Sequence, residues 1–293
     1  MRGALVPALT LLAGAVCGYL IALSVPREET LSLRPGALPL QQFGRLDLVI
    51  LAGQSNMSGR GSAGVAPPIT QDLRGRVFIF GNNYRWQEAR EPVDSPRGQV
   101  DMVSVDPDAA VGPALYFAAH ALEREPDRRF GLVPCARGAS LIAEWQRNPS
   151  DDTLYGSCLK RVRAASTAGR PALLLFYQGE WDGLDPDQLA GTPFAGFTHA
   201  SDWGDYFVRF ANDFRSDLGQ PALPIVFGVL GDHANPVKFT RWAEVQESQR
   251  ALRLEFSARI ETAGLPLRDG VHFTAVAQAE IGRRFADAWL DQF

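Results

Sequence analysis

Five short apolar runs recur along the chain, and they lack the alternation of polar and apolar residues that marks a half-exposed strand. They occupy residues 46–52, 77–80, 130–133, 172–177 and 225–230. Nearly uninterrupted runs of this length suit strands covered on both faces, which is the usual state of parallel sheets. The runs therefore predict a sheet buried between two outer layers.

Segments with helical patterns separate these runs. Residues 113–124 follow Gly112, begin with proline and are apolar on nearly all sides, which predicts a buried helix. Residues 274–293 predict an amphipathic helix, because apolar side chains recur at four-residue spacing. These are Ala277, Ile281, Phe285 and Trp289. Strands that alternate with helices predict an α/β layer sandwich.

The N-terminal part differs from the rest. Residues 3–25 carry no charge, and Arg27 and Glu28 follow soon after. Such a stretch is long enough to cross a hydrocarbon core of about 30 Å. We expect residues 1–25 to be an uncleaved signal anchor, with a cleaved signal peptide or a buried helix as alternatives. Residues 26–44 then form a linker, and residues 45–293 form a domain outside the cytoplasm, membrane-anchored or secreted.

Composition excludes some classes of function. The formal net charge is −4 and no long basic stripe occurs, so nucleic-acid binding is not expected. No Cys-x-x-Cys or His-Glu-x-x-His pattern occurs, which argues against a zinc enzyme. In the exported part, Cys135 and Cys158 either pair or remain separate thiols, and the sequence leaves both states open.

The first motif that carries chemistry is Gly53-Gln54-Ser55-Asn56-Met57, directly after the first apolar run. Catalytic groups in open α/β sheets gather at the carboxyl ends of strands. A serine in this position presents its hydroxyl to the crevice, and its own N–H lies at a helix start where it can hold an oxyanion. The alternative is that Ser55 only caps the helix.

A second motif, Asp269-Gly270-Val271-His272, comes just before the terminal helix. A serine needs an adjacent base to take its proton, and that base must be held in one tautomer. An aspartate three residues before a histidine can place carboxylate and imidazole on one short loop. The alternative is a surface turn followed by a capping histidine.

The third motif is Gln178-Gly179-Glu180-Trp181-Asp182, at the end of the fourth run. The Gln178 amide or the Gly179 N–H can donate to a developing oxyanion. Glu180 and Asp182 have an alternative role in fixing loops. Trp181 has two possible roles, stacking on a sugar ring or covering the core.

The order of these motifs, with Val111-Gly112-Pro113-Ala114 between the first and third, resembles the SGNH (GDSL-like) hydrolases. More closely, it resembles the carbohydrate-esterase branch that holds acetylxylan esterases and sialate O-acetylesterases. Residues 133–142 with Trp145, and Leu154-Tyr155 after them, are similar to further blocks of that branch. The resemblance covers residues 46–290.

This resemblance implies a three-layer α/β/α sandwich with a central, mostly parallel sheet of about five strands, and no metal or organic cofactor. It also implies roles for individual residues. It implies that Ser55 is the nucleophile, His272 the general base and Asp269 the carboxylate that orients the base. The implied oxyanion donors are the N–H groups of Ser55 and Gly112 and the Gln178 amide, with the Gly138 N–H as a rival to that of Gly112. Glu180 is implied to support the site without reacting.

Two positions depart from the family pattern. Arg137-Gly138 stands where two glycines are usual, and Trp181 where a small residue is usual. Both positions are expected to border the pocket. For Arg137, a salt bridge to a surface acid is expected, and binding of a carboxylate on an acidic sugar is the alternative.

The implied reaction is hydrolysis of an O-acyl, chiefly O-acetyl, ester on a carbohydrate through an acyl-enzyme. The expected partners are this substrate and, through residues 1–25, a membrane. Two other functions stay open: a glycan O-acetyltransferase with the same triad, and a non-catalytic carbohydrate-binding protein. The sequence gives no indication of the oligomeric state.

Overall fold

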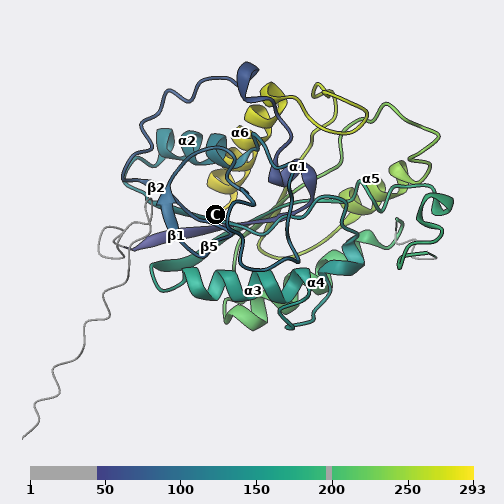
Figure 1. The fold of residues 1–293 in the computed structure, drawn as a ribbon, viewed down its shortest axis with the longest axis horizontal. Helices are drawn as coiled ribbons and strands as arrows, with labels where there is room; N and C mark the ends of the chain where they lie inside the picture. The colour runs from purple at the N-terminus through teal and green to yellow at the C-terminus, as the bar shows by residue number, and fades with distance from the viewer. Residues whose placement is uncertain (1–44, 196–199) are drawn as a thin grey trace, which may run out of the picture. The chain divides into compact units, whose positions relative to one another are not determined.

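The computed structural model describes residues 45–195 and 200–293. Within them one seven-stranded sheet has the order β3-β2-β4-β1-β5-β6-β7 (Figure 1). The strands are β1 (Leu46–Gly53), β2 (Val77–Phe80), β3 (Trp86–Glu88), β4 (Phe130–Pro134), β5 (Gly169–Tyr177), β6 (Ile225–Gly228) and β7 (Ser257–Ile260). All neighbouring strands pair in parallel except β3, which is antiparallel to β2.

Each of the five apolar runs forms a strand, and the predicted α/β/α fold class is confirmed. The central strand β1 is buried at every position except Asp47, as expected for a strand covered on both faces. Two edge strands, β3 and β7, were not expected. Their sequences, Trp-Gln-Glu and Ser-Ala-Arg-Ile, are short and polar because an edge strand faces solvent on one side.

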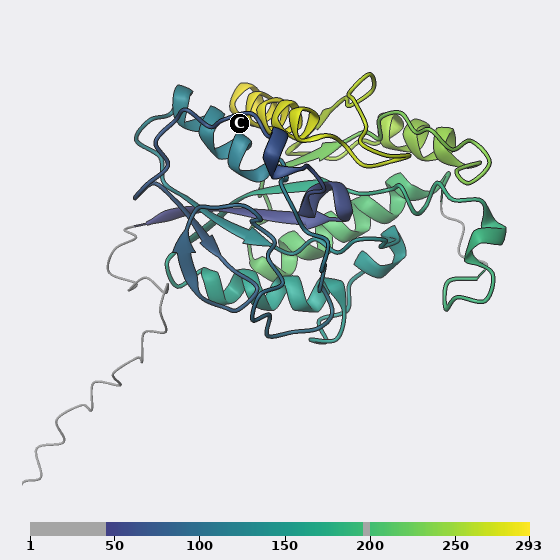
Figure 2. The same cartoon turned by 45° about the horizontal axis from the view of Figure 1, so that its top comes forward.

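Helices cover both faces of the sheet. They are α1 (Ser55–Ser58), α2 (Ala114–Arg124), α3 (Leu154–Ala165), α4 (Trp203–Leu218), α5 (Trp242–Ala251) and α6 (Ala275–Gln292), with short 3₁₀ turns η2 (Ala63–Val65), η3 (Ile142–Trp145) and η4 (Pro186–Leu189). Figure 2 shows α2 and α6 on one face and α3 and α4 on the other. The sheet is therefore the middle of three layers.

The predicted helices at 113–124 and 274–293 are α2 and α6, which pack against each other. The four apolar side chains spaced along α6 are all buried, as its periodicity predicted. At Gly282 the helices approach so closely that a Cβ atom would lie 2.4 Å from the Pro113 carbonyl oxygen. Thr274 caps α6 by accepting a hydrogen bond from the Ala277 N–H.

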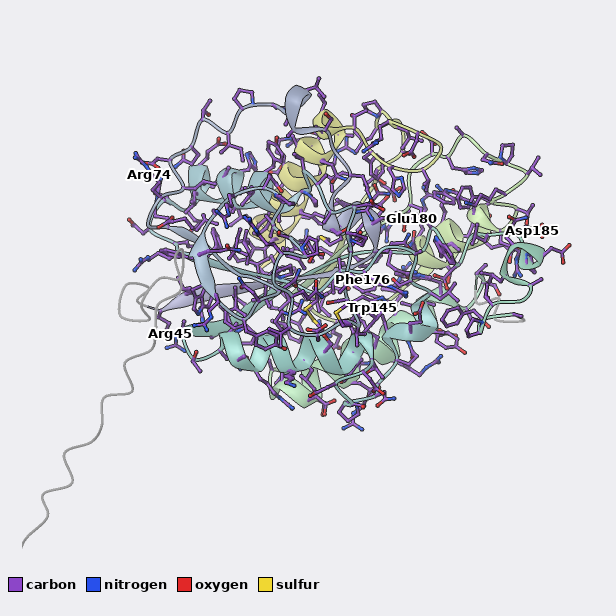
Figure 3. The ribbon with its side chains drawn as sticks, viewed as in Figure 1. Arg45, Arg74, Trp145, Phe176, Glu180 and Asp185 are labelled. Carbon is purple, nitrogen blue, oxygen red and sulfur yellow. A yellow bond between two sulfur atoms is a disulfide. The ribbon has the colours of Figure 1, made fainter. Side chains whose placement is uncertain are left out.

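Aromatic side chains fill the opposite face. Trp145 and Phe176 meet edge to face with ring centroids 5.6 Å apart, and both lie in the interior (Figure 3). Phe207 and Phe210 of α4 pack on Phe176 at centroid distances of 4.9 and 5.4 Å. Rings of this size dominate core energetics, so this cluster fixes β5 against α4.

A disulfide joins the end of β4 to α3. Cys135 and Cys158 are bonded, with their Cα atoms 5.3 Å apart. The Cys135 N–H also donates to the Leu51 carbonyl of β1. The structure thus resolves the choice that the sequence left open in favour of the pair, and the crosslink holds the chain just before residues 136–140.

The expected signal segment (1–25) and linker (26–44) lie outside the described residues. Within residues 45–195 and 200–293, no helix combines the length and apolar character needed to cross a membrane.

Candidate active site

Ser55 is the first residue of the short helix α1, which follows β1 after Gln54. Gly53 ends the strand with φ +127°, and a Cβ atom there would fall 2.1 Å from the Tyr177 carbonyl oxygen. Only glycine tolerates both the backbone angle and this close approach. The Gln54 N–H then donates to the same carbonyl, which turns the chain and places Ser55 at the carboxyl edge of the sheet.

The loop before α6 places His272 and Asp269 together. The Asp269 Oδ1 accepts hydrogen bonds from the N–H groups of Val271 at 3.0 Å and His272 at 2.8 Å. The Arg268 N–H closes the loop on the His272 carbonyl at 2.8 Å. These bonds leave the second carboxylate oxygen of Asp269 directed at the imidazole.

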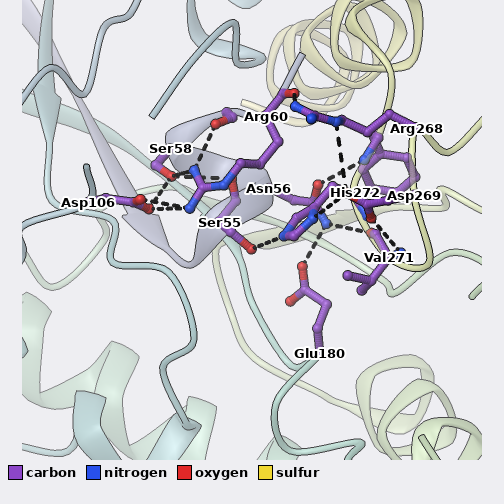
Figure 4. Close-up of polar contacts among 12 residues, drawn as sticks. Ser55, Asn56, Ser58, Arg60, Asp106, Glu180, Arg268, Asp269, Val271 and His272 are labelled. Atoms are coloured by element: carbon purple, nitrogen blue, oxygen red, sulfur yellow. Dashed lines mark hydrogen bonds and ion pairs between the residues drawn. The ribbon is translucent and has the colours of Figure 1, made fainter. Parts of the chain in front are cut away.

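A continuous hydrogen-bonded row connects the three side chains. The distance from Asp269 Oδ2 to His272 Nδ1 is 2.9 Å, and that from His272 Nε2 to Ser55 Oγ is 3.0 Å (Figure 4). Partial burial acts to raise the pKa of Asp269, but hydrogen bonds from the His272 and Val271 N–H groups and the imidazole outweigh it and lower the pKa. The carboxylate is therefore ionised wherever the site operates near neutral pH.

Asn56, the residue after Ser55, connects α1 to the loop of residues 268–273, which we call the histidine loop. Its Nδ2 donates to Glu180 Oε1 at 2.8 Å and to the Val271 carbonyl at 3.1 Å, while its Oδ1 accepts the Phe273 N–H at 3.1 Å. The Asn56 side chain thus fixes the loop on both sides of His272. Sequence reasoning assigned it no role, although its position inside the serine motif was a signal.

Glu180 lies beneath this contact and bonds neither Ser55 nor His272 among the described residues. Its Oε1 accepts the Asn56 amide, and its buried Oε2 has no hydrogen-bond partner in the described part of the chain. Burial raises the pKa of Glu180 to about 7. The position suits the supporting role that the family resemblance implied.

A buried ion pair supports α1 from its other end. Arg60 Nη2 contacts both oxygens of Asp106, at 2.7 and 2.8 Å, and Ser58 Oγ donates to Asp106 Oδ2 at 2.6 Å (Figure 4). Arg268 Nη1 in turn donates to the Arg60 carbonyl at 2.6 Å, so the histidine loop is also held here. Neither Arg60 nor Asp106 lies in a recognisable motif, and no local sequence pattern indicates the pair.

Gln178 differs from expectation. Its amide nitrogen donates to the Ser140 carbonyl at 2.7 Å and to Asp182 Oδ2 at 2.5 Å, and its oxygen accepts the Trp203 indole N–H at 2.8 Å. The residue is fully buried. Because both amide hydrogens already have acceptors, Gln178 in this arrangement holds loops together and offers no donor to a substrate oxygen.

The two glycines considered as oxyanion donors differ from each other. The Gly112 N–H makes no hydrogen bond among the described residues. The Gly138 N–H donates to Asp106 Oδ2 at 3.0 Å. By contrast, the Ser55 N–H begins α1, where the helix itself does not use it, and no acceptor for it is found among the described residues.

The two positions that depart from the family pattern lie close to the site. The Arg137 N–H donates to the Gly53 carbonyl. Its side chain forms the expected kind of ion pair, at 3.0 Å, but the acid is the largely buried Glu144 and not a surface residue. Trp181 is partly buried and packs against the core. No group of three or more metal-binding side chains occurs in the described ranges.

Comparison with known proteins places the chain in a family. Residues 45–291 match the family model described as carbohydrate esterase, sialic acid-specific acetylesterase. The chain belongs to this carbohydrate esterase family. It is therefore a carboxylic ester hydrolase, and the resemblance read from its motifs is confirmed.

Individual relatives agree with this assignment. A probable carbohydrate esterase from Arabidopsis thaliana is 31% identical over 286 residues, covering 92% of this chain and 97% of the relative. A solved Arabidopsis thaliana structure superposes with a TM-score of 0.70 at 29% identity, covering 85% of this chain and 99% of that one. NanS shares the fold at a TM-score of 0.58 and 19% identity, covering 84% and 97%.

Four buried carboxyl groups predict how the stability of this esterase depends on pH. Burial raises the pKa of Glu91 to about 8 and those of Asp94, Glu180 and Asp182 to about 7. Their pKa values in the folded state exceed those in the unfolded state, so the folded state binds more protons between about pH 4 and pH 8. We expect the melting temperature to fall as pH rises through this window.

Carboxylates with a lowered pKa have the opposite effect on how stability depends on pH. Hydrogen bonds from Arg283 and Arg284 lower the pKa of Glu280 to about 2, and stability from such groups is lost only as the pH falls below about 4. Thermal melts should therefore peak between about pH 4 and pH 5. A Glu91→Gln variant should show a shallower decline above pH 6, whereas the exposed replacement Glu247→Gln should leave the slope unchanged. A melting temperature that rises from pH 5 to pH 8 would contradict the prediction.

Proposed function

We propose that this esterase hydrolyses O-acetyl esters of a carbohydrate, with Ser55 as nucleophile, His272 as general base and Asp269 as the carboxylate that orients it. The observation that carries the proposal is the bridging position of His272. One imidazole nitrogen lies 2.9 Å from Asp269 and the other 3.0 Å from Ser55 Oγ, and these residues come from opposite ends of the domain. Such an arrangement is what an activated serine requires.

The reaction follows from this geometry. Ser55 Oγ attacks the ester carbonyl carbon while His272 Nε2 takes its proton, giving a tetrahedral oxyanion. The protonated imidazole, stabilised by Asp269, then gives the proton to the sugar oxygen, which leaves as an alcohol. Water attacks the acyl-Ser55 ester with the same histidine as base, and acetate is released.

The oxyanion needs hydrogen-bond donors that are free in the resting enzyme. We assign the Ser55 N–H to this task, because it is unused and adjoins the reacting oxygen. The Gly112 N–H stays a second candidate, because no hydrogen bond occupies it among the described residues. Gln178 is not included, since Ser140 and Asp182 occupy its amide hydrogens. The choice of acetyl and of a carbohydrate rests on the family description and on the relatives' printed names.

A fluorophosphonate probe followed by peptide mass spectrometry tests the assignment. The probe should modify Ser55 in the wild type, and His272→Ala should abolish the modification because the hydroxyl then lacks its base. Modification of another serine would refute the site. Acetate release from O-acetylated sugars, compared with acetyl transfer to an added sugar, separates hydrolysis from the transferase alternative.

We also propose that the domain functions outside the cytoplasm. The disulfide between Cys135 and Cys158 supports this, because such bonds persist in oxidising compartments. The apolar composition of residues 3–25 suits an export signal or anchor. Fractionation of cells that express the full chain, with immunodetection of the domain, tests both statements.

A further inference from the structure

Asp106 lies on the loop between β3 and α2 and belongs to none of the motifs that the proposed reaction uses. Its side chain is only 3% exposed, so the carboxylate is enclosed by protein. A buried charge is costly unless it is paired and hydrogen-bonded. The groups that surround this carboxylate therefore indicate its role.

The Asp106 carboxylate is bonded to the helix that carries the proposed nucleophile. Oδ2 accepts the Ser58 hydroxyl at 2.6 Å, and Arg60 Nη2 lies 2.7 and 2.8 Å from the two carboxylate oxygens (Figure 4). Oδ2 also accepts the Gly138 N–H at 3.0 Å. Because Ser58 is the last residue of α1 and Ser55 is the first, these bonds fix the far end of a helix of one turn.

The ion pair extends this contact to the histidine loop. Arg60 Nη1 donates to the Gly59 carbonyl at 2.8 Å and to Ser58 Oγ at 2.9 Å, which folds the side chain back against the end of α1. The Arg60 carbonyl accepts Arg268 Nη1 at 2.6 Å, and Arg268 directly precedes Asp269. The nucleophile helix and the histidine loop are thus connected through Arg60, the partner of the buried carboxylate.

The loop that carries Asp106 also leads to Gly112, the second candidate oxyanion donor. Gly61 and Val111 exchange backbone hydrogen bonds of 2.9 and 3.2 Å, so the two segments run side by side. They pack so closely that a Cβ atom on Gly59 would lie 2.6 Å from the Gly112 nitrogen. Gly112 is therefore placed by the same contacts that fix the end of α1.

The loop is itself anchored from its other side by Arg161 of α3. Arg161 is fully buried, and its Nη2 donates to Asp101 Oδ2 at 2.5 Å and to Ser104 Oγ at 3.1 Å. Both acceptors come shortly before Asp106 in the chain. Because these bonds hold the loop without help from α1, Asp106 is a fixed point against which α1 is held.

We propose that Asp106 is a positioning residue for the ester hydrolysis, whose carboxylate holds Ser55, the Gly112 N–H and the histidine loop in one arrangement. This rests on the proposed function and deepens it. Asp106 does not touch the reacting atoms, so its contribution is geometric. Its loss should lower kcat and leave KM nearly unchanged, because stabilisation of the transition state depends on alignment far more than binding of the substrate does.

Asp106→Asn tests the proposal with little change in shape. If the asparagine oxygen accepts the Ser58 and Gly138 donors, its amide group faces the Arg60 guanidinium, and donors then oppose each other. We expect kcat for acetate release to fall about 10²-fold, the cost of a misplacement of about 1 Å, with KM within about twofold of the wild-type value. A folded Asp106→Asn enzyme with the wild-type kcat would overturn the proposal.

Asp217→Asn is the matched control. Asp217 lies near the end of α4, contacts no residue of the proposed triad, and also binds an arginine and a hydroxyl, those of Arg147 and Tyr155. Its replacement should lower the melting temperature and leave kcat unchanged. The comparison separates the loss of a well-bonded carboxylate in general from the loss of this one.

Inhibition by methylboronic acid separates positioning from a general loss of stability. Its boron bonds to Ser55 Oγ while His272 takes the proton, giving a tetrahedral, negatively charged centre that needs the same donors as the transition state. The inhibition constant should rise about 10²-fold in Asp106→Asn, in step with kcat, and stay unchanged in Asp217→Asn. A lowered kcat with an unchanged inhibition constant would also overturn the proposal.

Ser58→Ala keeps the proposal testable if Asp106→Asn fails to fold. It removes one bond between α1 and Asp106 and leaves the ion pair with Arg60 in place, so kcat should fall about tenfold. Ser166→Ala removes a comparable hydroxyl at the end of α3, which bonds the Val162 carbonyl at 2.8 Å, and should leave kcat unchanged. A Ser58→Ala enzyme with the wild-type kcat would refute the positioning role.

The activity of the wild type distinguishes this inference from the proposed function. If the wild type releases no acetate from any acetyl ester, the proposed function itself fails. If the wild type is active and Ser55→Ala is not, an unaffected Asp106→Asn enzyme refutes only the positioning role.

Discussion

The Ser55→Ala variant should hydrolyse acetyl esters about 10⁶-fold more slowly than the wild type, an effect of the size seen when another serine hydrolase loses its nucleophile. Without Oγ no acyl-enzyme forms, and only direct attack by water remains. The methyl group of alanine fits the space of the serine, and the hydrogen bonds of Asn56 do not involve Oγ, so the fold should persist. Steady-state acetate release measures the loss, and a thermal melt checks folding.

Ser62→Ala provides the matched control. This serine lies seven positions further along the chain, is exposed and caps η2 without a side-chain hydrogen bond. Its replacement should leave the rate unchanged. A Ser55→Ala variant that retains more than about one per cent of wild-type activity, after contaminating esterase has been excluded with an independent preparation, would show that another group is the nucleophile.

Asp269→Asn should lower kcat about 10⁴-fold through the tautomer of His272. The N–H groups of Val271 and His272 both require an acceptor at the position of Oδ1. The asparagine must therefore place its oxygen there and its amide nitrogen toward His272 Nδ1. That nitrogen becomes an acceptor, so the ring carries its proton on Nε2, facing Ser55, and cannot take a proton from the hydroxyl.

Comparison with other variants identifies this cause. The exposed replacement Asp152→Asn should retain full activity, and Asp269→Ala should also lose activity, since it removes both the loop bonds and the orienting charge. Nitrogen-15 NMR of the imidazole reports the tautomer directly. A fully active Asp269→Asn enzyme, or one with its His272 proton still on Nδ1, would contradict the mechanism.

The sequence predicted those parts of the site that depend on local geometry. Asp269 and His272 are three residues apart, and a turn that brings them together needs no distant partner. Ser55 follows a buried strand, so the sheet alone places it at the carboxyl edge. The apolar runs likewise predicted the five inner strands, because burial on both faces leaves a strong compositional signal.

The parts that sequence reasoning missed depend on contacts between distant segments. The direction of the Gln178 amide is set by Ser140, Asp182 and Trp203, and no local pattern shows that all three converge on it. The Arg60–Asp106 pair joins two loops that carry no motif. The edge strands β3 and β7 were not predicted, because their short polar sequences resemble those of loops.

The disulfide between Cys135 and Cys158 connects the redox conditions under which the chain folds to the structure around Ser55. It anchors the residue just before the 136–140 segment, and that segment lies beside Ser55 because the Arg137 N–H bonds the Gly53 carbonyl. A chain folded where thiols stay reduced keeps every residue of the triad but lacks this anchor. We therefore expect preparations of identical sequence from reducing and oxidising hosts to differ in specific activity, and the host becomes a variable in any such comparison.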